Sequence, residues 1–190
     1  MEEIWKRIEI WLETNAPRVL TDLYVGISTS EIESLEKVAG FELSDFLKES
    51  LSIHNGQDGR FRLVYPWEIF PIEAIEIEKN RMSSDFVDQL RSNNVELENG
   101  IDVYGPVKST VWNDKWIPFS SDGSGNLLCI DNDPAEGGNL GQVILWASDP
   151  PYVEVIASNY RVWLEQFASD LERDLYAWDA QTEFWSRVDR

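Results

Sequence analysis

Apolar residues recur three or four positions apart through much of the first half of the chain and again near its end. Charged and polar residues lie between them, which is the pattern of amphipathic helices with one buried face. Two overlapping Ser-x-x-Glu patterns precede the second segment, and we expect Ser30, rather than Ser28, to cap its N-terminus and Gly40 to cap its C-terminus. The pattern predicts helices over residues 3–14, 30–39, 44–53, 79–92 and 160–178, with a weaker helical tail over residues 179–190.

The centre of the chain has a different pattern, in which short runs of β-branched and aromatic residues alternate with turns rich in Gly, Pro, Asn and Asp. Residues 72–77 fit either a strand or the start of a helix. Because helices come first, strands follow and a helix comes last, we predict a single α+β domain. Its central sheet should be mostly antiparallel, with helices packed on one face and helices at both termini. The predicted strands are residues 61–65, 103–112, 116–119, 127–131, 142–147 and 153–156.

Composition narrows the function mainly by exclusion. Apolar residues make up 43% of the 190 residues and aromatic residues 12%, which is enough to build a core. The 16 Lys and Arg against 35 Asp and Glu give a formal net charge of −19, which argues against binding to nucleic acid or to anionic membranes. The N-terminus lacks the pattern of a secretory signal, and no uncharged stretch is long enough to span a membrane, so we expect a cytoplasmic protein.

The residue types that most often carry catalysis are scarce. The only histidine, His54, lies in a His-Asn-Gly sequence typical of a helix end, and the only cysteine, Cys129, lies in an apolar run, so we interpret both as structural. The acidic run over residues 131–136 fails the spacing of an EF-hand loop, which leaves a casual cation site there as an open alternative. We predict no catalytic residue, no metal-ligand set and no cofactor. A hydrolase that uses paired carboxylates is an alternative of another class.

Charge is unevenly distributed along the chain. Residues 116–160 contain no Lys or Arg, and several of their carboxylates fall in predicted loops near aromatic residues. One interpretation is an ordinary solvated acidic face, and the other is a surface that attracts and holds a basic protein partner. On the second interpretation the predicted partner-binding residues are Asp122, Asp131, Asp133, Glu136, Asp149 and Trp112.

Two ordered strings of residues resemble a known family. The first, in residues 32–56, contains Ile-Glu-x-Leu-Glu, Gly-Phe-x-Leu and a closing His-Asn-Gly. The second, in residues 116–143, contains Trp-Ile-Pro-Phe, Asp-Gly-x-Gly-Asn, Asp-x-Asp-Pro and Gly-Gln-Val. Together they resemble the SUKH superfamily, specifically its Smi/Knr-type group, although Ser44 stands where that family often has Pro. We therefore predict an N-terminal helix and linker over residues 1–28, a Smi/Knr-type domain over residues 29–171 and a helical tail over residues 172–190.

The resemblance implies an α+β fold without catalytic residues, in which Gly123, Gly125, Asn126 and Gly141 hold turns. Many bacterial members are immunity proteins that neutralise a toxin, and fungal members are scaffolds in cell-wall assembly. With the acidic composition, this leads us to predict a non-enzymatic protein-binding module, an immunity protein that occludes a basic toxin domain such as a nuclease. The alternative is an intracellular scaffold or regulator of cell-wall assembly. We expect a monomer or weak dimer that binds neither nucleic acid nor membranes.

Overall fold

Three apolar runs in the middle of the chain pair side by side at the centre of a six-stranded sheet. The computed structural model describes residues 1–94, 96, 98 and 100–188, without the side chains of Val38 and Ala39. The strand order is β3 (Glu68–Ile69), β5 (Trp116–Ser121), β6 (Leu127–Asp131), β7 (Gln142–Ser148), β8 (Pro151–Ala157) and β4 (Asp102–Tyr104). All neighbours are antiparallel except β8 and β4. The predicted α+β fold with a mostly antiparallel sheet is confirmed.

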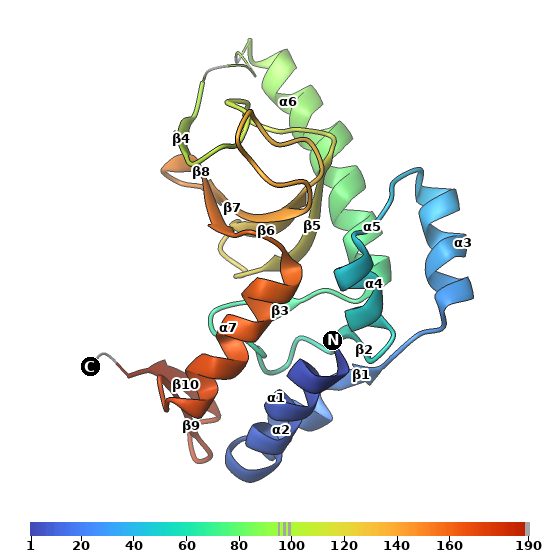
Figure 1. Cartoon of the computed structure of the whole chain (residues 1–190). Coiled ribbons are helices and arrows are strands. Elements are labelled where there is room, and N and C mark those ends of the chain that lie inside the picture. Colours follow the sequence, from blue (N-terminus) through green and yellow to red (C-terminus); the bar gives the residue numbers. More distant parts are fainter. Residues whose placement is uncertain (95, 97, 99, 189–190) are drawn as a thin grey trace.

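Apart from the short strand β3, the strands of the sheet follow every helix except α7 in the sequence (Figure 1). The helices are α1 (Glu2–Asn15), α2 (Pro17–Thr21), α3 (Thr29–Ala39), α4 (Asp45–Leu51), α5 (Ile72–Asn80), the π-helical segment η1 (Arg81–Phe86), α6 (Val87–Ser92) and α7 (Tyr160–Glu172). The ambiguous residues 72–77 are therefore helical. The expected linker contains α2 and a short strand, β1 (Leu23–Val25), which pairs with β2 (His54–Gln57). No helix among the described residues is long and apolar enough to cross a membrane.

The central strands are buried on both faces of the sheet. Ile117, Phe119 and Leu128 belong to one core cluster, whereas Trp116 and Cys129 belong to a second. Helices α1, α4 and α7 contribute to the first cluster, and η1 with α6 contributes to the second (Figure 1). Our prediction of helices on one face only is therefore wrong, because strands that are apolar at nearly every position need cover on both sides.

The start of α3 shows which of the two overlapping patterns forms the cap. The Ser28 hydroxyl accepts the Glu31 N–H at 3.3 Å, and the Glu31 carboxylate accepts the Ser28 N–H at 2.8 Å. These reciprocal bonds make Ser28 the N-cap, so our choice of Ser30 is wrong. Gly40 ends the helix with a φ of 71°, a left-handed conformation that glycine adopts without strain, and this confirms the predicted C-cap.

Two predicted strands are replaced by irregular structure. Residues 61–65 form no strand, and the buried side chain of Gln57 takes the place of a strand partner: its Oε1 accepts the N–H of Leu63 at 3.1 Å and that of Ile69 at 3.0 Å. Of residues 103–112, only the first two belong to a strand, β4. Apolar and β-branched residues in both segments pack in the core without pairing in a sheet. The sequence pattern cannot distinguish these two uses of the same residue types.

The C-terminal tail is a β-hairpin and not the predicted helix. Helix α7 ends at Glu172, and β9 (Tyr176–Asp179) then pairs with β10 (Phe184–Arg187). Asp174 follows the helix with a φ of 55°, a left-handed conformation that ends helices. Trp185 belongs to the first core cluster and Trp178 packs against it, so the hairpin is part of the same core as α1. The hairpin follows the end of α7 (Figure 1).

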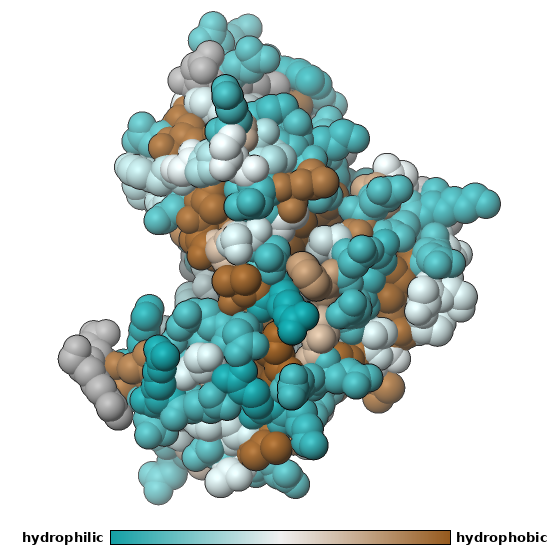
Figure 2. Space-filling view, viewed as in Figure 1, coloured by the Kyte–Doolittle hydropathy of each residue, from teal (hydrophilic) through white to brown (hydrophobic). Residues whose placement is uncertain are grey.

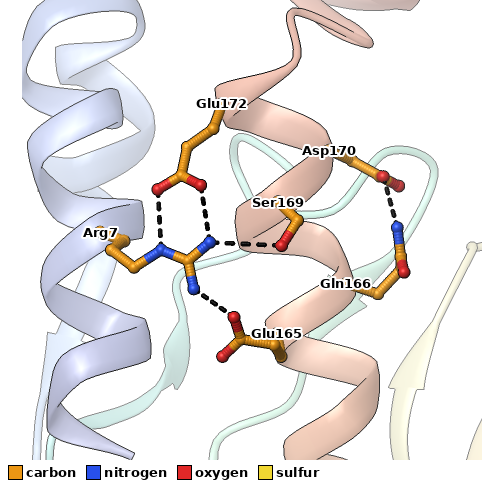
Figure 3. A network of polar contacts seen from close by, with 6 residues as sticks. All are labelled: Arg7, Glu165, Gln166, Ser169, Asp170 and Glu172. Carbon is orange, nitrogen blue, oxygen red and sulfur yellow. Dashed lines mark hydrogen bonds and ion pairs between the residues drawn. The ribbon is translucent and has the colours of Figure 1, made fainter.

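Arg7 joins helices from the two ends of the sequence. Its guanidinium donates to the Glu172 carboxylate at 2.7 and 2.6 Å and to the Ser169 hydroxyl at 3.2 Å, and it also pairs with Glu165 (Figure 3). Both carboxylates raise the pKa of Arg7, and Arg7 lowers the pKa of Glu172. The packing of α1 on α7 is thereby supplemented by a fork of charge-assisted hydrogen bonds.

We expect Arg7→Met to lower the free energy of unfolding by about 1 kcal/mol, because water competes for these partly exposed partners. Urea denaturation followed by far-UV circular dichroism measures the change. Arg91→Met is the matched control, since Arg91 pairs with Asp88 at 3.2 Å on an exposed surface and should leave stability unchanged. Equal losses in the two variants would show that the contact between α1 and α7 does not depend on Arg7.

Candidate partner-binding cleft

The predicted acidic residues are divided between the two ends of the sheet. Asp122 lies in the turn between β5 and β6, and Asp149 lies in the turn between β7 and β8. These turns are joined by Asn126, whose Oδ1 accepts the N–H of Ser148 at 3.0 Å. At the other end of β6 lie Asp131, Asp133 and Glu136. The structure therefore does not bring the five carboxylates together.

Asp122 is engaged within its own turn. Its carboxylate accepts the backbone N–H of Ser124 at 2.7 Å, the backbone N–H of Asn126 at 3.1 Å and the side-chain amide of Asn126 at 2.7 Å. Gly123 and Gly125 have φ values of 76° and 101°, which residues with a side chain rarely adopt. This geometry supports the turn-holding role expected for Gly123, Gly125 and Asn126.

Asp131 is fully buried at the end of β6, with 0% of its surface exposed. Its carboxylate accepts the Trp116 indole N–H at 3.1 Å, the Asp133 backbone N–H at 2.9 Å and the Gln142 side-chain amide at 2.9 Å. Burial raises the pKa of Asp131, although the three hydrogen bonds oppose this shift. The predicted contact role does not fit this position: Asp131 fixes the start of the β6–β7 connection from inside.

The other predicted contact residues differ in how far they are available. The Asp133 carboxylate accepts hydrogen bonds from Nδ2 of Asn113 at 3.0 Å and from Nζ of Lys108 at 2.5 Å, and these bonds lower the pKa of Asp133. Trp112 is buried in the second core cluster, so it is not a surface anchor as predicted. The predicted contact residues that are exposed are Glu136 and Asp149, whose role in binding stays a prediction.

The turn before β7 presents an apolar side chain to solvent. Gly141 has a φ of 80°, and its N–H donates to the Asp131 carbonyl at 2.8 Å. The Gln142 N–H donates to the Asn139 carbonyl at 3.0 Å, which closes the turn. Leu140 lies inside this turn and is 75% exposed. The buried Asp131 therefore helps to position an exposed leucine.

Leu140 lines an open cleft of about 1590 Å³ between the sheet and helices α3 and α4. One wall is residues 40–46, which comprise the connection from α3 and the start of α4, and the other is the start of β5 with the β6–β7 connection. Helix α3 stands away from the sheet, beyond α4 and α5 (Figure 1), and apolar side chains lie among hydrophilic ones on this side of the surface (Figure 2). The charged lining residues are Glu33, Glu36, Lys37, Glu42, Asp45, Glu49, Lys79, Asp114 and Lys115.

Lys79 lines the cleft although it is only 7% exposed. Its ammonium donates to the Ser83 hydroxyl at 2.6 Å, one turn later on η1, and the Trp112 indole N–H donates to the same hydroxyl at 3.3 Å. Burial lowers the pKa of Lys79, and the nearby Asp114 carboxylate opposes this shift. The cleft thus contains a positive group held in place by the second core cluster.

The two residues considered for catalysis lie outside the cleft lining. The His54 ring lies between Glu9 Oε1 at 2.7 Å and the Tyr24 carbonyl at 3.2 Å. Cys129 is fully buried on β6, where burial raises the pKa of its thiol. Among the described residues, no group of three or more His, Cys, Asp or Glu side chains is placed to hold a metal ion.

Neither Leu140 nor Lys79 is among the residues that we predicted to bind a partner, although both line the cleft. An apolar residue between Asn and Gly in a turn was the available signal for Leu140, because such a side chain has no place in a local core. No comparable signal marked Lys79, since its burial depends on how α5 packs on β5.

A family model described as "SMI1 / KNR4 family (SUKH-1)" matches residues 26–166 of the chain. The chain belongs to the SMI1/KNR4 family. Membership confirms the resemblance drawn from the two ordered strings of residues. In this SMI1/KNR4 protein the matched range includes both walls of the cleft, whereas α1 and the β9–β10 hairpin lie outside it.

Relatives from fungi are similar to nearly the whole SMI1/KNR4 chain. The Schizosaccharomyces pombe "Cell wall biosynthesis/cell cycle regulator smi1" is 28% identical over 182 residues, covering 90% of this chain and 36% of the relative. The Neurospora crassa "Glucan synthesis regulatory protein" is 26% identical, covering 94% and 40%. The Saccharomyces cerevisiae "Cell wall assembly regulator SMI1" is 24% identical, covering 96% and 43%. The chain thus spans less than half the length of these relatives.

Proposed function

We propose that this chain is a non-catalytic protein-binding module that takes part in regulating cell-wall assembly. The observation that carries the proposal is the family match over residues 26–166, together with relatives named for cell wall biosynthesis, glucan synthesis and cell wall assembly. The module acts inside the cell and holds a segment of a partner protein in the cleft between the sheet and α3–α4.

The comparisons support this regulator alternative better than the predicted immunity protein. Of the three relatives described above, two are named for the cell wall and one for glucan synthesis, and none of these three names mentions a toxin. The carboxylates expected to hold a basic toxin domain lie at opposite ends of the sheet, and Asp131 is buried among them. The immunity interpretation stays an untested prediction, and Glu136 and Asp149 are the most exposed of its predicted contact residues.

Deleting the gene in the organism that carries it tests the proposal. We expect growth of the deletion strain to stop at a lower concentration of a cell-wall-perturbing agent than growth of the parent strain, because wall assembly has lost a regulator. Re-expression of the chain should restore tolerance, and a translation inhibitor should affect both strains equally. Unchanged tolerance to the wall agent would contradict the proposal. Death of the deletion strain only in contact with parent cells would support the immunity prediction instead.

A further inference from the structure

The cleft presents a large apolar side chain from a rigid turn. Leu140 is 75% exposed, yet the turn around it is held by the Gly141 N–H on the Asp131 carbonyl at 2.8 Å. The Asn139 N–H also donates to the side chain of Gln142 at 3.1 Å, and Gln142 is fully buried. Because these bonds fix the main chain of the turn, only the rotamer of Leu140 has to be ordered on binding, so this residue suits an anchor contact.

Carboxylates outnumber ammonium groups around this leucine. Six of the charged residues that line the cleft are acidic and three are lysines. Glu42 and Asp114 lie on opposite walls and are exposed, and among the described residues neither pairs with a Lys or Arg within 4.0 Å. A surface of this sign attracts a basic segment of a partner and slows its release.

Lys79 limits how a basic segment can enter. Ser83 accepts one of its three ammonium hydrogens, and the other two have no acceptor among the described residues. A Lys or Arg head group at this depth would meet like charge, whereas a main-chain carbonyl would supply the missing acceptor. The basic side chains of a bound segment must therefore point to the walls, with the main chain over Lys79.

We propose that the cleft binds an extended segment of a partner protein in which a Lys or Arg stands next to a large apolar residue, an inference that rests on the proposed function. The apolar residue packs on Leu140, the basic residue contacts Glu42 and Asp114, and a main-chain carbonyl accepts from Lys79. The cleft volume of about 1590 Å³ exceeds the roughly 300–1,000 Å³ of small-molecule pockets, which favours a chain segment as occupant.

Fluorescence anisotropy with labelled peptides of equal length tests this inference. The probes are an alternating Lys–Leu peptide, a Glu–Leu peptide and a Lys–Ser peptide, each titrated with the whole chain at low and at physiological salt. We expect the Lys–Leu peptide to bind tightest and Leu140→Ser to weaken it about tenfold, the effect of losing one buried apolar contact. Glu42→Lys combined with Asp114→Lys should weaken it by a similar factor and reduce the salt dependence.

A second charge-reversal pair is the matched control. Asp102→Lys combined with Glu13→Lys changes the net charge equally, but both residues are exposed and outside the cleft lining. Asp102 lies at the opposite end of the sheet from Leu140, and Glu13 lies near the end of α1. This variant should change affinity by less than about twofold, because salt screens charges at that distance. Equal losses in the two charge-reversal variants would show non-specific attraction and overturn the inference.

Three further outcomes would overturn it. Tighter binding of the Glu–Leu peptide would make Lys79, and not the carboxylates, the dominant group. Equal binding of the Lys–Ser peptide would remove Leu140 as an anchor, and absence of binding at about 1 mM peptide would leave less than about 4 kcal/mol of affinity. Failure of the proposed function is separate: a normal response of the deletion strain to wall agents alongside cleft-dependent peptide binding would reject only the cell-wall role.

Discussion

Trp185→Ala in the C-terminal hairpin should lower the free energy of unfolding by about 3–5 kcal/mol, the range for truncating a buried Trp side chain. Trp185 is 2% exposed, and its ring centroid lies 5.7 Å from that of Trp11 and 5.4 Å from that of Trp178. The smaller side chain would leave a void between α1 and the hairpin that neither element can close alone. Urea denaturation followed by far-UV circular dichroism measures the loss.

Phe184→Ala is the control for this variant. Phe184 immediately precedes Trp185 on β10, is 56% exposed, and packs against the Tyr65 ring in a T-shaped arrangement with centroids 5.3 Å apart. Its removal should cost less than about 1 kcal/mol, since little apolar surface returns to water. A loss for Trp185→Ala no larger than that for Phe184→Ala would mean that the hairpin does not stabilise the rest of the chain.

The hairpin was missed because its residues satisfy two periods at once. Leu171, Leu175 and Trp178 are spaced four and three apart, which continues the pattern of α7, while Tyr176 and Trp178 are spaced two apart as in a strand. The residue that ends the helix is Asp174 and not a glycine or proline, so the usual stop signal is absent. Only packing against α1 decides between the two structures.

The strands at the centre of the sheet could be predicted because their residues fit only one type of secondary structure. Residues 127–131 and 142–147 are short, apolar and bounded by Gly- and Asp-rich turns, and runs of that length are too short for a core helix. What the pattern could not show is that both faces are buried. An alternating pattern identifies which face of a strand is buried, but a continuous apolar run does not. We therefore did not predict that η1 and α6 cover the second face of the sheet.

The candidate site was harder to predict than the fold because sequence proximity does not report position on a sheet. Asp122 and Asp131 are nine positions apart, yet they lie at opposite ends of β6, whose five residues span about 13 Å at the rise of a strand. Conversely, Gly141 lies beside Ser44, almost a hundred residues earlier. These two distant segments line opposite walls of the cleft, and no local sequence motif predicts that they lie close together.

Asp131→Asn should destabilise the chain by about 1–3 kcal/mol, the cost of a buried polar group left without a partner. The three groups that face this carboxylate are all donors: the Trp116 indole, the Asp133 N–H and the Gln142 amide. An asparagine brings an NH₂ group that would oppose the Gln142 amide, and Gln142 cannot reverse without losing its bonds to the Asn139 N–H and the Pro106 carbonyl. Urea denaturation at neutral pH measures the effect, and unchanged stability would contradict this assignment of donors.

The stability of Asp131→Asn measured as a function of pH shows whether burial or hydrogen bonding has the larger effect on the pKa of Asp131. Burial raises its pKa above the ordinary 3.8, so the stabilisation that protonation gives is complete below that value and is lost as pH rises through the folded pKa. Because asparagine does not titrate, the stability difference between the parent chain and Asp131→Asn should widen as pH falls.

Asp133→Asn should behave in the opposite way. Hydrogen bonds from Asn113 and Lys108 lower the pKa of Asp133, so its contribution is present above the ordinary 3.8 and is lost as pH falls through the folded pKa. The stability difference between the parent chain and Asp133→Asn should therefore narrow as pH falls. If the difference for Asp131→Asn also narrowed, its three hydrogen bonds would outweigh burial, and the carboxylate that positions the Leu140 turn would stay ionised to below the ordinary pKa of 3.8.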